Sequence, residues 1–281
     1  MEKLNISYNG PMYKDFYDEF SALLNTAIAL SVKYSRIPAP EGKHWYASAL
    51  FTKLCVTGKS MQKILPNSNR KLEIQHWDFA SVASLSRVFL ENYLMFFYLC
   101  IDDVSKDEWD FRWRLLNLHD HVSRIKFTCD LEANEEKKAE LLKDNEVLLI
   151  CKDELNANPI FSALPEKKRN HYLRGVEAFN MSQDDLVTKI GISTPSFRAI
   201  YRFLSSQVHT FPMAFYRLAE HERGKGVYCA QELYYHIMIL EWLVPIFSMA
   251  NNNFSVLFNG LEHLKIKSRI QLRSATLAYA A

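Results

Sequence analysis

The segment 201–209 combines titratable and polar side chains within an otherwise apolar helical pattern. Arg202 and His209 lie seven positions apart, so on an α-helix they fall within about 20° of the same face. Tyr201, Ser205 and His209 form a second stripe with a spacing of four residues. A histidine can act as a general acid or base, and an arginine can stabilise charge that develops on a phosphate. The spacing therefore makes Arg202, His209 and Ser205 candidate catalytic residues for phosphodiester chemistry.

The separation of Arg202 and His209 does not by itself distinguish them from other pairs in the chain. Comparable separations occur between Arg70 and His76, Arg112 and His119, Arg114 and His119, and Arg114 and His121. The 201–209 segment differs because it lies in a helix with clear start and stop signals, which should pack in the core. The structural alternative is that His209 caps the negative end of this helix, contributing about 0.3–1 kcal/mol, while Arg202 pairs with a surface acid.

Two patterns resemble metal-binding motifs but do not predict a metal site. Glu73 and His76 have the Glu-x-x-His spacing of helix bundles that bind two metal ions, yet such sites need a second copy and further carboxylates. His119 and His121 are two positions apart, so on a helix they point about 200° apart. The chain also lacks a glycine-rich phosphate loop, a Gly-x-Ser-x-Gly elbow and a His-Glu-x-x-His zinc helix. We therefore expect neither a metal nor another cofactor.

Apolar residues recur every three to four positions over most of the chain, a pattern that predicts amphipathic helices. The expected helices cover residues 13–36, 45–65, 76–101, 105–129, 134–155, 182–191, 193–212, 229–250 and 255–264. The 76–101 helix is almost continuously apolar and should be central. The prediction is an all-α, single-domain bundle of roughly eight to ten helices over residues 1–264, followed by a basic tail at 265–281.

Short polar patterns mark the expected helix ends. Ser105 and Glu108 form a capping-box pattern, in which the two side chains satisfy each other's backbone donors. Ser182, followed by acidic residues, is typical of another helix start, and Gly191 should end that helix. Pro195 suits the first turn of the next helix, where its missing N–H costs nothing.

Length, composition and charge exclude several classes of protein. A chain of 281 residues can bury a large core, and only 8 glycines argue against a turn-rich β protein. The formal charge of +2 is far from the strongly basic balance of a dedicated nucleic-acid coat. The 5 cysteines are scattered and the N-terminus lacks a secretory pattern, which together predict a cytoplasmic protein.

The segment 233–250 comes nearest to a membrane span but contains His236, Glu241 and Pro245. A charged residue near a bilayer centre costs about 2.5–3.5 kcal/mol even on insertion scales. The sequence therefore predicts a buried core helix and no membrane span.

Two blocks of the sequence resemble a large bacterial family of helical proteins whose function is unassigned. One block contains Arg87 and Glu91 in an Arg-x-x-x-Glu pattern, and the other leads from residue 182 through Tyr201 and Ser205 to His209. The resemblance implies that both blocks form one site, with Arg87 and Glu91 on one helix and the other three residues on a second. Such a network is either a satisfied structural cluster or a pre-organised functional site.

A looser resemblance connects the chain with the HEPN-type ribonucleases. These are helical dimers in which an arginine and a histidine, with four to six residues between them, face RNA phosphate. Arg202 and His209 have this separation. The sequence departs from the HEPN pattern at Phe203, where a small polar residue is usual. It departs from the bacterial helical family at Thr210, where that family has a small residue.

Two hypotheses follow. The first is a metal-independent endoribonuclease of HEPN type, in a bacterial toxin or phage-defence setting, that acts as a homodimer on RNA. His209 would be the general acid or base at the ribose 2′-hydroxyl, and Arg202 would stabilise the phosphate charge. Ser205 or Tyr201 would orient either group. The alternative is a non-catalytic helical interaction or regulatory protein in which the same network specifies the packing of two helices.

Overall fold

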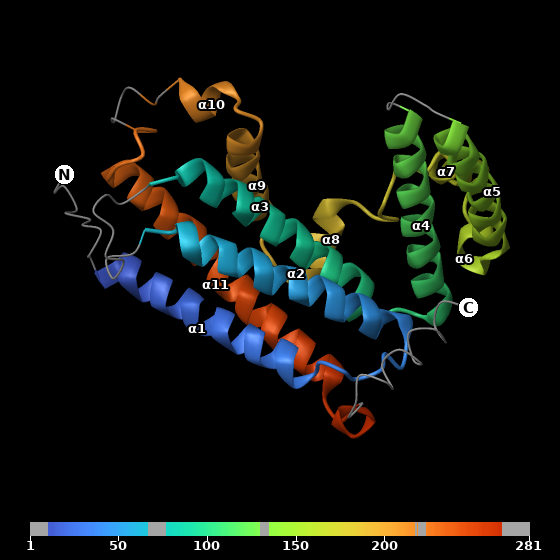
Figure 1. Ribbon diagram of the computed structural model, residues 1–281, viewed down its shortest axis with the longest axis horizontal. Coiled ribbons are helices and arrows are strands. Elements are labelled where there is room, and N and C mark those ends of the chain that lie inside the picture. Colours follow the sequence, from blue (N-terminus) through green and yellow to red (C-terminus); the bar gives the residue numbers. More distant parts are fainter. Residues whose placement is uncertain (1–10, 67–76, 130–134, 217, 219–222, 266–281) are drawn as a thin grey trace. The chain divides into compact units, whose positions relative to one another are not determined.

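The computed structural model describes residues 11–66, 77–129, 135–216, 218 and 223–265. Within these ranges the chain forms eleven α-helices, nine of them with 7 or more residues, and no strand. Figure 1 shows the order of these helices along the chain. The predicted all-α fold class is therefore confirmed. The predicted boundary before a basic tail lies next to residues 266–281, which are outside the described ranges, and stays a prediction.

The helices belong to two compact units. That residues 1–264 form one domain stays a prediction. The first unit comprises residues 1–101 and 190–281, and the second comprises residues 102–189. The chain thus leaves the first unit after its third helix and returns to it at the end of its eighth.

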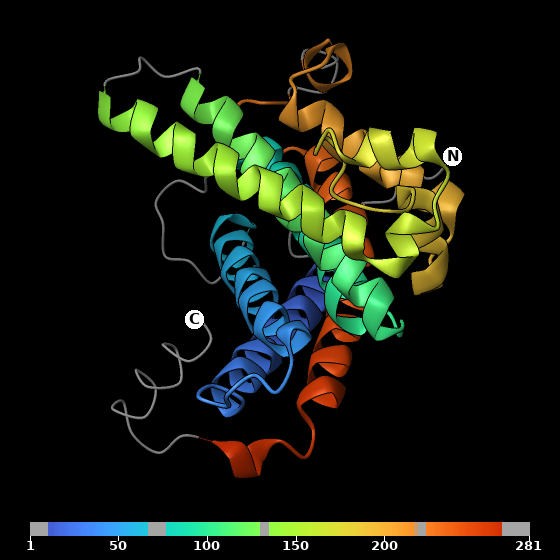
Figure 2. The same cartoon turned by 90° about the vertical axis from the view of Figure 1, so that its right-hand side faces the viewer.

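Four long helices form the centre of the first unit and lie side by side in Figures 1 and 2. They are α1 (Pro11–Lys33), α2 (Gly42–Ile64), α3 (Phe79–Phe96) and α11 (Ala230–Phe258). The shorter helices of this unit are α9 (Thr194–Val208) and α10 (Pro212–Phe215). α3 packs against α2, α9 and α11, so the prediction that this apolar helix is central is confirmed.

Aromatic rings fill the centre of the first unit. Phe51 and Phe254 stack with their ring centroids 3.9 Å apart. The ring of Phe247 contacts both Phe20 and Phe89, at 5.7 and 5.0 Å. Each of these side chains is at most 2% exposed, and aromatic pairs stabilise a core beyond the area that they bury. This core fixes α3, and through α3 it fixes the residues that face α9.

α11 is a single helix from Ala230 to Phe258, so the prediction of two helices separated near residue 251 is wrong. Pro245 lies inside it without ending it. The asparagines at the expected break find partners outside their own helix: Asn251 donates to the carbonyl of Leu23 at 3.0 Å, and Asn253 donates to the hydroxyl of Tyr93 at 3.3 Å. Because these amides do not compete for the local backbone, the helix continues.

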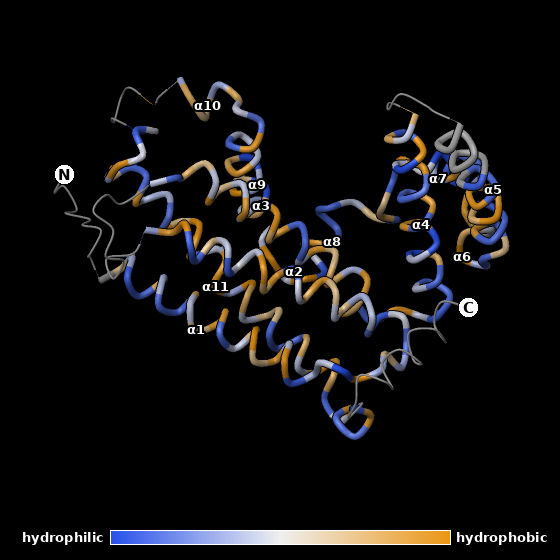
Figure 3. Tube along the Cα trace, in the orientation of Figure 1, coloured by the Kyte–Doolittle hydropathy of each residue, from blue (hydrophilic) through white to orange (hydrophobic). Residues whose placement is uncertain are grey.

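By length and composition alone, α11 could cross a membrane, and it is the one such helix in the described part of the chain. Long hydrophobic stretches run along it in Figure 3. More than half of its most apolar window, 56%, is buried inside the protein, chiefly against α1. Such burial is typical of a helix that forms a protein core.

α3 begins one residue after Asp78, whose side chain accepts a hydrogen bond from the amide of Ser81 at 3.0 Å. The expected start near His76 falls on residues outside the described ranges. At the other end, the α-helix changes into a π-helical turn, Phe97–Ile101, which ends where the sequence predicts the helix to end.

The second unit contains α4 (Lys106–Cys129), α5 (Glu135–Ala157), α6 (Pro159–Ser162), α7 (Glu166–Tyr172) and most of α8 (Gln183–Ile190). Its core is the cluster Phe111, Leu115, Leu118, Leu155, Phe161 and Tyr172. Both predicted serine caps are present, because the amide of Glu108 donates to Ser105 Oγ and the amide of Asp185 donates to Ser182 Oγ, both at 3.2 Å. The reciprocal half of the predicted capping box is not among the described hydrogen bonds, since Glu108 Oε1 accepts from Arg112 and Asn180.

Candidate functional site

Four side chains meet at the surface of the first unit: two from α3, one from the middle of α9 and one from its C-cap. We call them the Arg87 cluster, comprising Arg87, Glu91, Tyr201 and His209. Arg87 Nε donates to Glu91 Oε1 at 3.0 Å, one turn along α3. The hydroxyl of Tyr201 accepts from Arg87 Nη2 at 3.1 Å and donates to Glu91 Oε1 at 2.7 Å. Three side chains from two helices therefore close a ring of hydrogen bonds.

His209 completes the cluster through its ring. Its Nε2 lies 3.2 Å from Arg87 Nη1. A guanidinium has donors only, so in this contact Nε2 must be the acceptor. Such a hydrogen bond needs a lone pair on Nε2, and the ring proton then lies on Nδ1. This is the form that can accept a proton from a substrate.

The geometry of α9 places Tyr201 and His209 opposite α3. Pro195 stands in the first turn, as predicted, and Gly191 precedes the helix with a φ of +86°. The helix ends at Val208, not near Pro212 as the sequence suggested. Two features explain the earlier end. Thr210 has a left-handed φ of +49°, and the residue before Pro212 is held in an extended conformation.

The cluster is accessible to solvent. The side chain of Arg87 is 20% exposed and that of Glu91 is 45% exposed, and His209 is also exposed. Burial acts to lower the pKa of Arg87, but the hydrogen bonds and charges of Tyr201 and Glu91 outweigh it, so the pKa is raised. The guanidinium also lies over the Tyr201 ring, 4.9 Å from its centroid. Arg87 is thus a cation held by three neighbouring side chains at a partly exposed surface.

The structure brings together four of the six residues expected at the site. Arg87, Glu91, Tyr201 and His209 meet, as the family resemblance implied; Arg202 and Ser205 do not join them. Arg202 is exposed, and no hydrogen bond or ion pair links it to His209 within the described ranges. The shared helix face assumed that α9 continues past His209, which instead occupies the C-cap.

Ser205 reaches the cluster only through the backbone. Its hydroxyl donates to the carbonyl of Tyr201 at 2.7 Å, and its own carbonyl accepts from the amide of His209 at 3.1 Å. The side chain therefore stabilises the last turns of α9 and does not contact the histidine ring.

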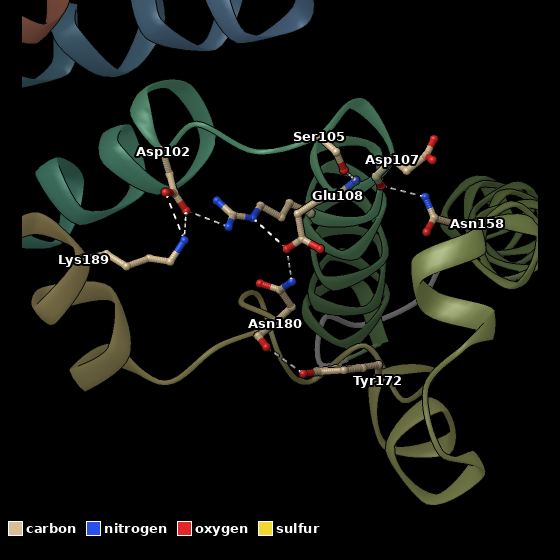
Figure 4. Close-up of polar contacts among 9 residues, drawn as sticks. Asp102, Ser105, Asp107, Glu108, Asn158, Tyr172, Asn180 and Lys189 are labelled. Atoms are coloured by element: carbon tan, nitrogen blue, oxygen red, sulfur yellow. Dashed lines mark hydrogen bonds and ion pairs between the residues drawn. The ribbon is translucent and has the colours of Figure 1, made fainter.

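A second polar cluster lies in the second unit and was missed by the sequence reasoning (Figure 4). Arg112 is 1% exposed and donates to Asp102 at 2.7 Å and to Glu108 at 3.2 Å. Lys189 also binds Asp102 at 2.8 Å, and Asn180 donates to Glu108 at 2.6 Å. Burial acts to raise the pKa of Asp102, but Lys189 and Arg112 outweigh it, and the pKa is lowered. These mutually neutralised charges form a structural network.

The sequence contains only a weak indication of that network. Arg112 follows Glu108 by four residues, and it falls beside Phe111 and Leu115 on the apolar stripe of its helix. An arginine on a core-facing stripe needs a buried carboxylate partner. Asp102, the nearest carboxylate in space, lies outside the helix and could not be assigned from periodicity.

The patterns that resembled metal motifs are either outside the described residues or otherwise engaged. Glu73 and His76 belong to the segment 67–76, which the structure does not describe. His119 Nδ1 donates to the carbonyl of Gly175 at 3.0 Å, so this ring stabilises a turn of the second unit.

Comparison with known proteins places the chain in a family. The matching family model is a family of unknown function (DUF5677), and the match covers residues 44–226. No curated protein and no solved structure matches the chain significantly. The matched span is more than half of the chain and contains all four residues of the Arg87 cluster. The chain therefore belongs to this family of unknown function, DUF5677.

Proposed function

We propose that the Arg87 cluster is the active site of a metal-independent endoribonuclease. The observation that carries the proposal is the 3.2 Å contact between Arg87 Nη1 and His209 Nε2 on an exposed surface. It pairs a cation, which suits a phosphate, with an imidazole nitrogen that can accept a proton. The proposal keeps the loose resemblance to HEPN-type ribonucleases but gives Arg87 the role that the sequence had assigned to Arg202.

The chemistry needs a substrate that displaces the contact between the two side chains. An RNA phosphate binds the Nη1 side of Arg87 and leaves the lone pair of His209 Nε2 for the ribose 2′-hydroxyl. As the 2′-oxygen attacks phosphorus, its proton moves to Nε2 and the bond from phosphorus to the 5′-oxygen breaks. The leaving 5′-oxygen takes a proton from a water molecule, and the protonated His209 returns its proton to the resulting hydroxide. The products are a 2′,3′-cyclic phosphate and a 5′-hydroxyl.

Tyr201 and Glu91 are the positioning residues of this scheme. Glu91 Oε1 accepts from both Arg87 Nε and the Tyr201 hydroxyl, which holds the guanidinium in one orientation. The single carboxylate of the cluster is therefore occupied by a cation, and a divalent metal placed there would be repelled by Arg87. Charge stabilisation by arginine, without a metal, is the chemistry that this arrangement favours.

We further propose that the enzyme acts as a homodimer. Exposed apolar side chains border the cluster on both helices: Val88 is 38% exposed next to Arg87, Val208 is 42% exposed and Phe211 is 55% exposed next to His209. A second copy that covers these side chains would bring two Arg87 clusters to one RNA-binding surface. A toxin or phage-defence role in the cytoplasm is the setting that we propose for such an enzyme.

The alternative proposal is a non-catalytic interaction or regulatory protein. It is supported by the closed ring of hydrogen bonds among Arg87, Glu91 and Tyr201, because such a ring also specifies how α3 packs against α9. Under this alternative His209 has no role in chemistry, and its removal affects packing alone.

The test is cleavage of a single-stranded RNA by the purified full chain in the presence of EDTA. We expect a 2′,3′-cyclic phosphate product and no cleavage of the matching 2′-deoxy strand, which lacks the nucleophile. His209→Ala should lower the rate by about 10²–10⁴-fold, the usual contribution of a general base, with an unchanged melting midpoint. Arg87→Ala should also abolish cleavage.

Two matched controls remove the same side-chain types outside the cluster. His263→Ala removes an exposed histidine, and Arg202→Ala removes an exposed arginine from α9 itself. Both should retain cleavage. Absence of cleavage by the wild-type protein across varied RNAs, together with a destabilised His209→Ala variant, would leave the structural alternative in place.

A further inference from the structure

A pocket of about 800 Å³ lies in the first unit on the side of α9 that faces away from the Arg87 cluster. Phe203 and Gln207 of α9 form one wall, and Tyr235, Met238 and Trp242 of α11 form another. Ligand pockets in proteins typically measure about 300–1,000 Å³ and are mostly apolar with few polar groups. This pocket has the size and the aromatic walls of a small-molecule site.

One cation lies among the described residues that line this pocket. Arg223 is only 7% exposed, and its Nε is buried without a hydrogen-bond partner in the described part of the chain. Its guanidinium lies 5.0 Å from the centroid of the Tyr235 ring. A buried guanidinium donor that binds no acceptor destabilises the protein, so an unpaired donor at a pocket wall is a position where a ligand acceptor would be stabilising.

The acidic residue nearest in the chain among the described positions is already engaged. Glu232 is 3% exposed, and its Oε1 accepts a hydrogen bond from the amide of Gly224 at 2.8 Å, the residue after Arg223. No aspartate or glutamate is among the described residues that line the pocket. Within the described lining, Arg223 is the one charged residue, and its Nε has no hydrogen-bond partner there.

We propose that this pocket binds a small molecule with a carboxylate on a planar aromatic body. The Nε and the neighbouring Nη of a guanidinium form a flat fork that matches the two oxygens of a carboxylate. Phe203, Tyr235 and Trp242 contact the aromatic body. A single arginine balances one negative charge, which favours a carboxylate over a phosphate ester with nearly two charges. This inference does not depend on the proposed ribonuclease activity.

The experiment compares acids with their uncharged amides by titration calorimetry on the full chain. The probes are benzoate, naphthoate and biphenyl carboxylate, each with its amide, and naphthyl phosphate. We expect at least one acid to bind saturably, with one ligand per chain, and its amide to bind at least about tenfold more weakly, as for the loss of one charge-assisted hydrogen bond. Naphthyl phosphate should bind more weakly than naphthoate.

Variants locate the binding in this pocket. Arg223→Gln should remove the difference between acid and amide. Ala199→Trp fills the pocket from an exposed position of α9 and should weaken both ligands, so it also tests the site if Arg223→Gln does not fold. Arg202→Gln removes an exposed arginine of the same helix outside the pocket and should change nothing.

Three results would overturn the proposal: no saturable binding of any acid at millimolar concentration, equal binding of acid and amide by the wild-type protein, or tighter binding of the phosphate ester than of naphthoate. Unchanged binding of both ligands by Ala199→Trp would place the site elsewhere and would also overturn it.

Discussion

The phenolic hydroxyl of Tyr201 donates a hydrogen bond to Glu91 Oε1, with 2.7 Å between the two oxygens. The phenolic oxygen also accepts from Arg87, so one hydroxyl connects α9 to both charged residues of α3. The charge pair on α3 and the orientation of α9 are therefore not independent. The predictions below separate this connection from other sources of stability.

Tyr201→Phe should keep the ring over Arg87 and remove both hydrogen bonds of the hydroxyl. We expect a loss of about 1 kcal/mol in the free energy of unfolding, the typical net contribution of a hydrogen bond. Chemical denaturation measures it. Tyr234→Phe, at a tyrosine that is 50% exposed on α11, is the matched control and should leave the midpoint unchanged. An equal effect of both variants would show that the hydrogen bonds of the Tyr201 hydroxyl do not contribute to the free energy of unfolding.

Arg112→Met should destabilise the protein by about 3–5 kcal/mol, because it removes the buried cation between Asp102 and Glu108, leaving Glu108 without an ion pair and Asp102 with Lys189 alone. Arg87→Met should cost only about 1 kcal/mol, because Glu91 is 45% exposed and water solvates it. Equilibrium unfolding of the two variants decides the order, and a larger loss for Arg87→Met would contradict it.

Stability should fall in mild acid because of His236. Burial lowers the pKa of this ring from 6.5 to about 4, although the Glu232 carbonyl partly opposes the shift. Between these values the unfolded chain binds a proton that the folded chain does not. Stability is thus fully present above pH 6.5 and decreases as the pH falls towards about 4, by about 3 kcal/mol in total.

The control for this pH dependence is His236→Phe, which keeps an aromatic ring against Trp77 and Phe79 but cannot titrate. Denaturation midpoints measured across the same pH range should lose most of their slope in the variant. A slope that persists would assign the acid sensitivity to other groups.

Gly175→Ala should be far more harmful than Gly191→Ala. Both glycines have a left-handed φ, +65° and +86°, so each alanine carries a backbone cost of about 1 kcal/mol. An added Cβ at Gly175 would lie 2.5 Å from Val122 Cγ2, whereas none of the described atoms lies within 4 Å of the Cβ position at Gly191. The difference between the two melting midpoints measures the steric part, and equal midpoints would contradict this account.

Local patterns predicted most of the helices because their physical causes are local. Ser105 and Ser182 cap the helices where expected, and the proline at 195 stands in the first turn of α9. The errors lie where contacts with residues distant in the sequence determine whether a helix ends or continues. The side-chain amides of Asn251 and Asn253 donate to Leu23 and Tyr93, and the local sequence 250–255 contains no information about these partners.

At the candidate site, too, some of the sequence predictions were correct and others were not. The family resemblance placed Arg87 and Glu91 with Tyr201 and His209, and the structure brings these four together. Helical spacing placed Arg202 with them because it assumed a helix that continues to Pro212. The left-handed residue Thr210 ends α9 early, and this change of backbone direction was not visible in the spacing.

α9 has 15 residues, and two different sides of it carry residues with a structural or proposed functional role. Tyr201 and Ser205 serve the side towards α3, whereas Phe203 and Gln207 serve the pocket. An ordinary amphipathic helix tolerates random replacement over about half of its circumference. In a saturation mutagenesis library, α9 should therefore accept substitutions only along the narrow strip of its surface that includes Arg202. Its mutational profile should resemble that of a helix buried on all sides, although α9 lies at the surface.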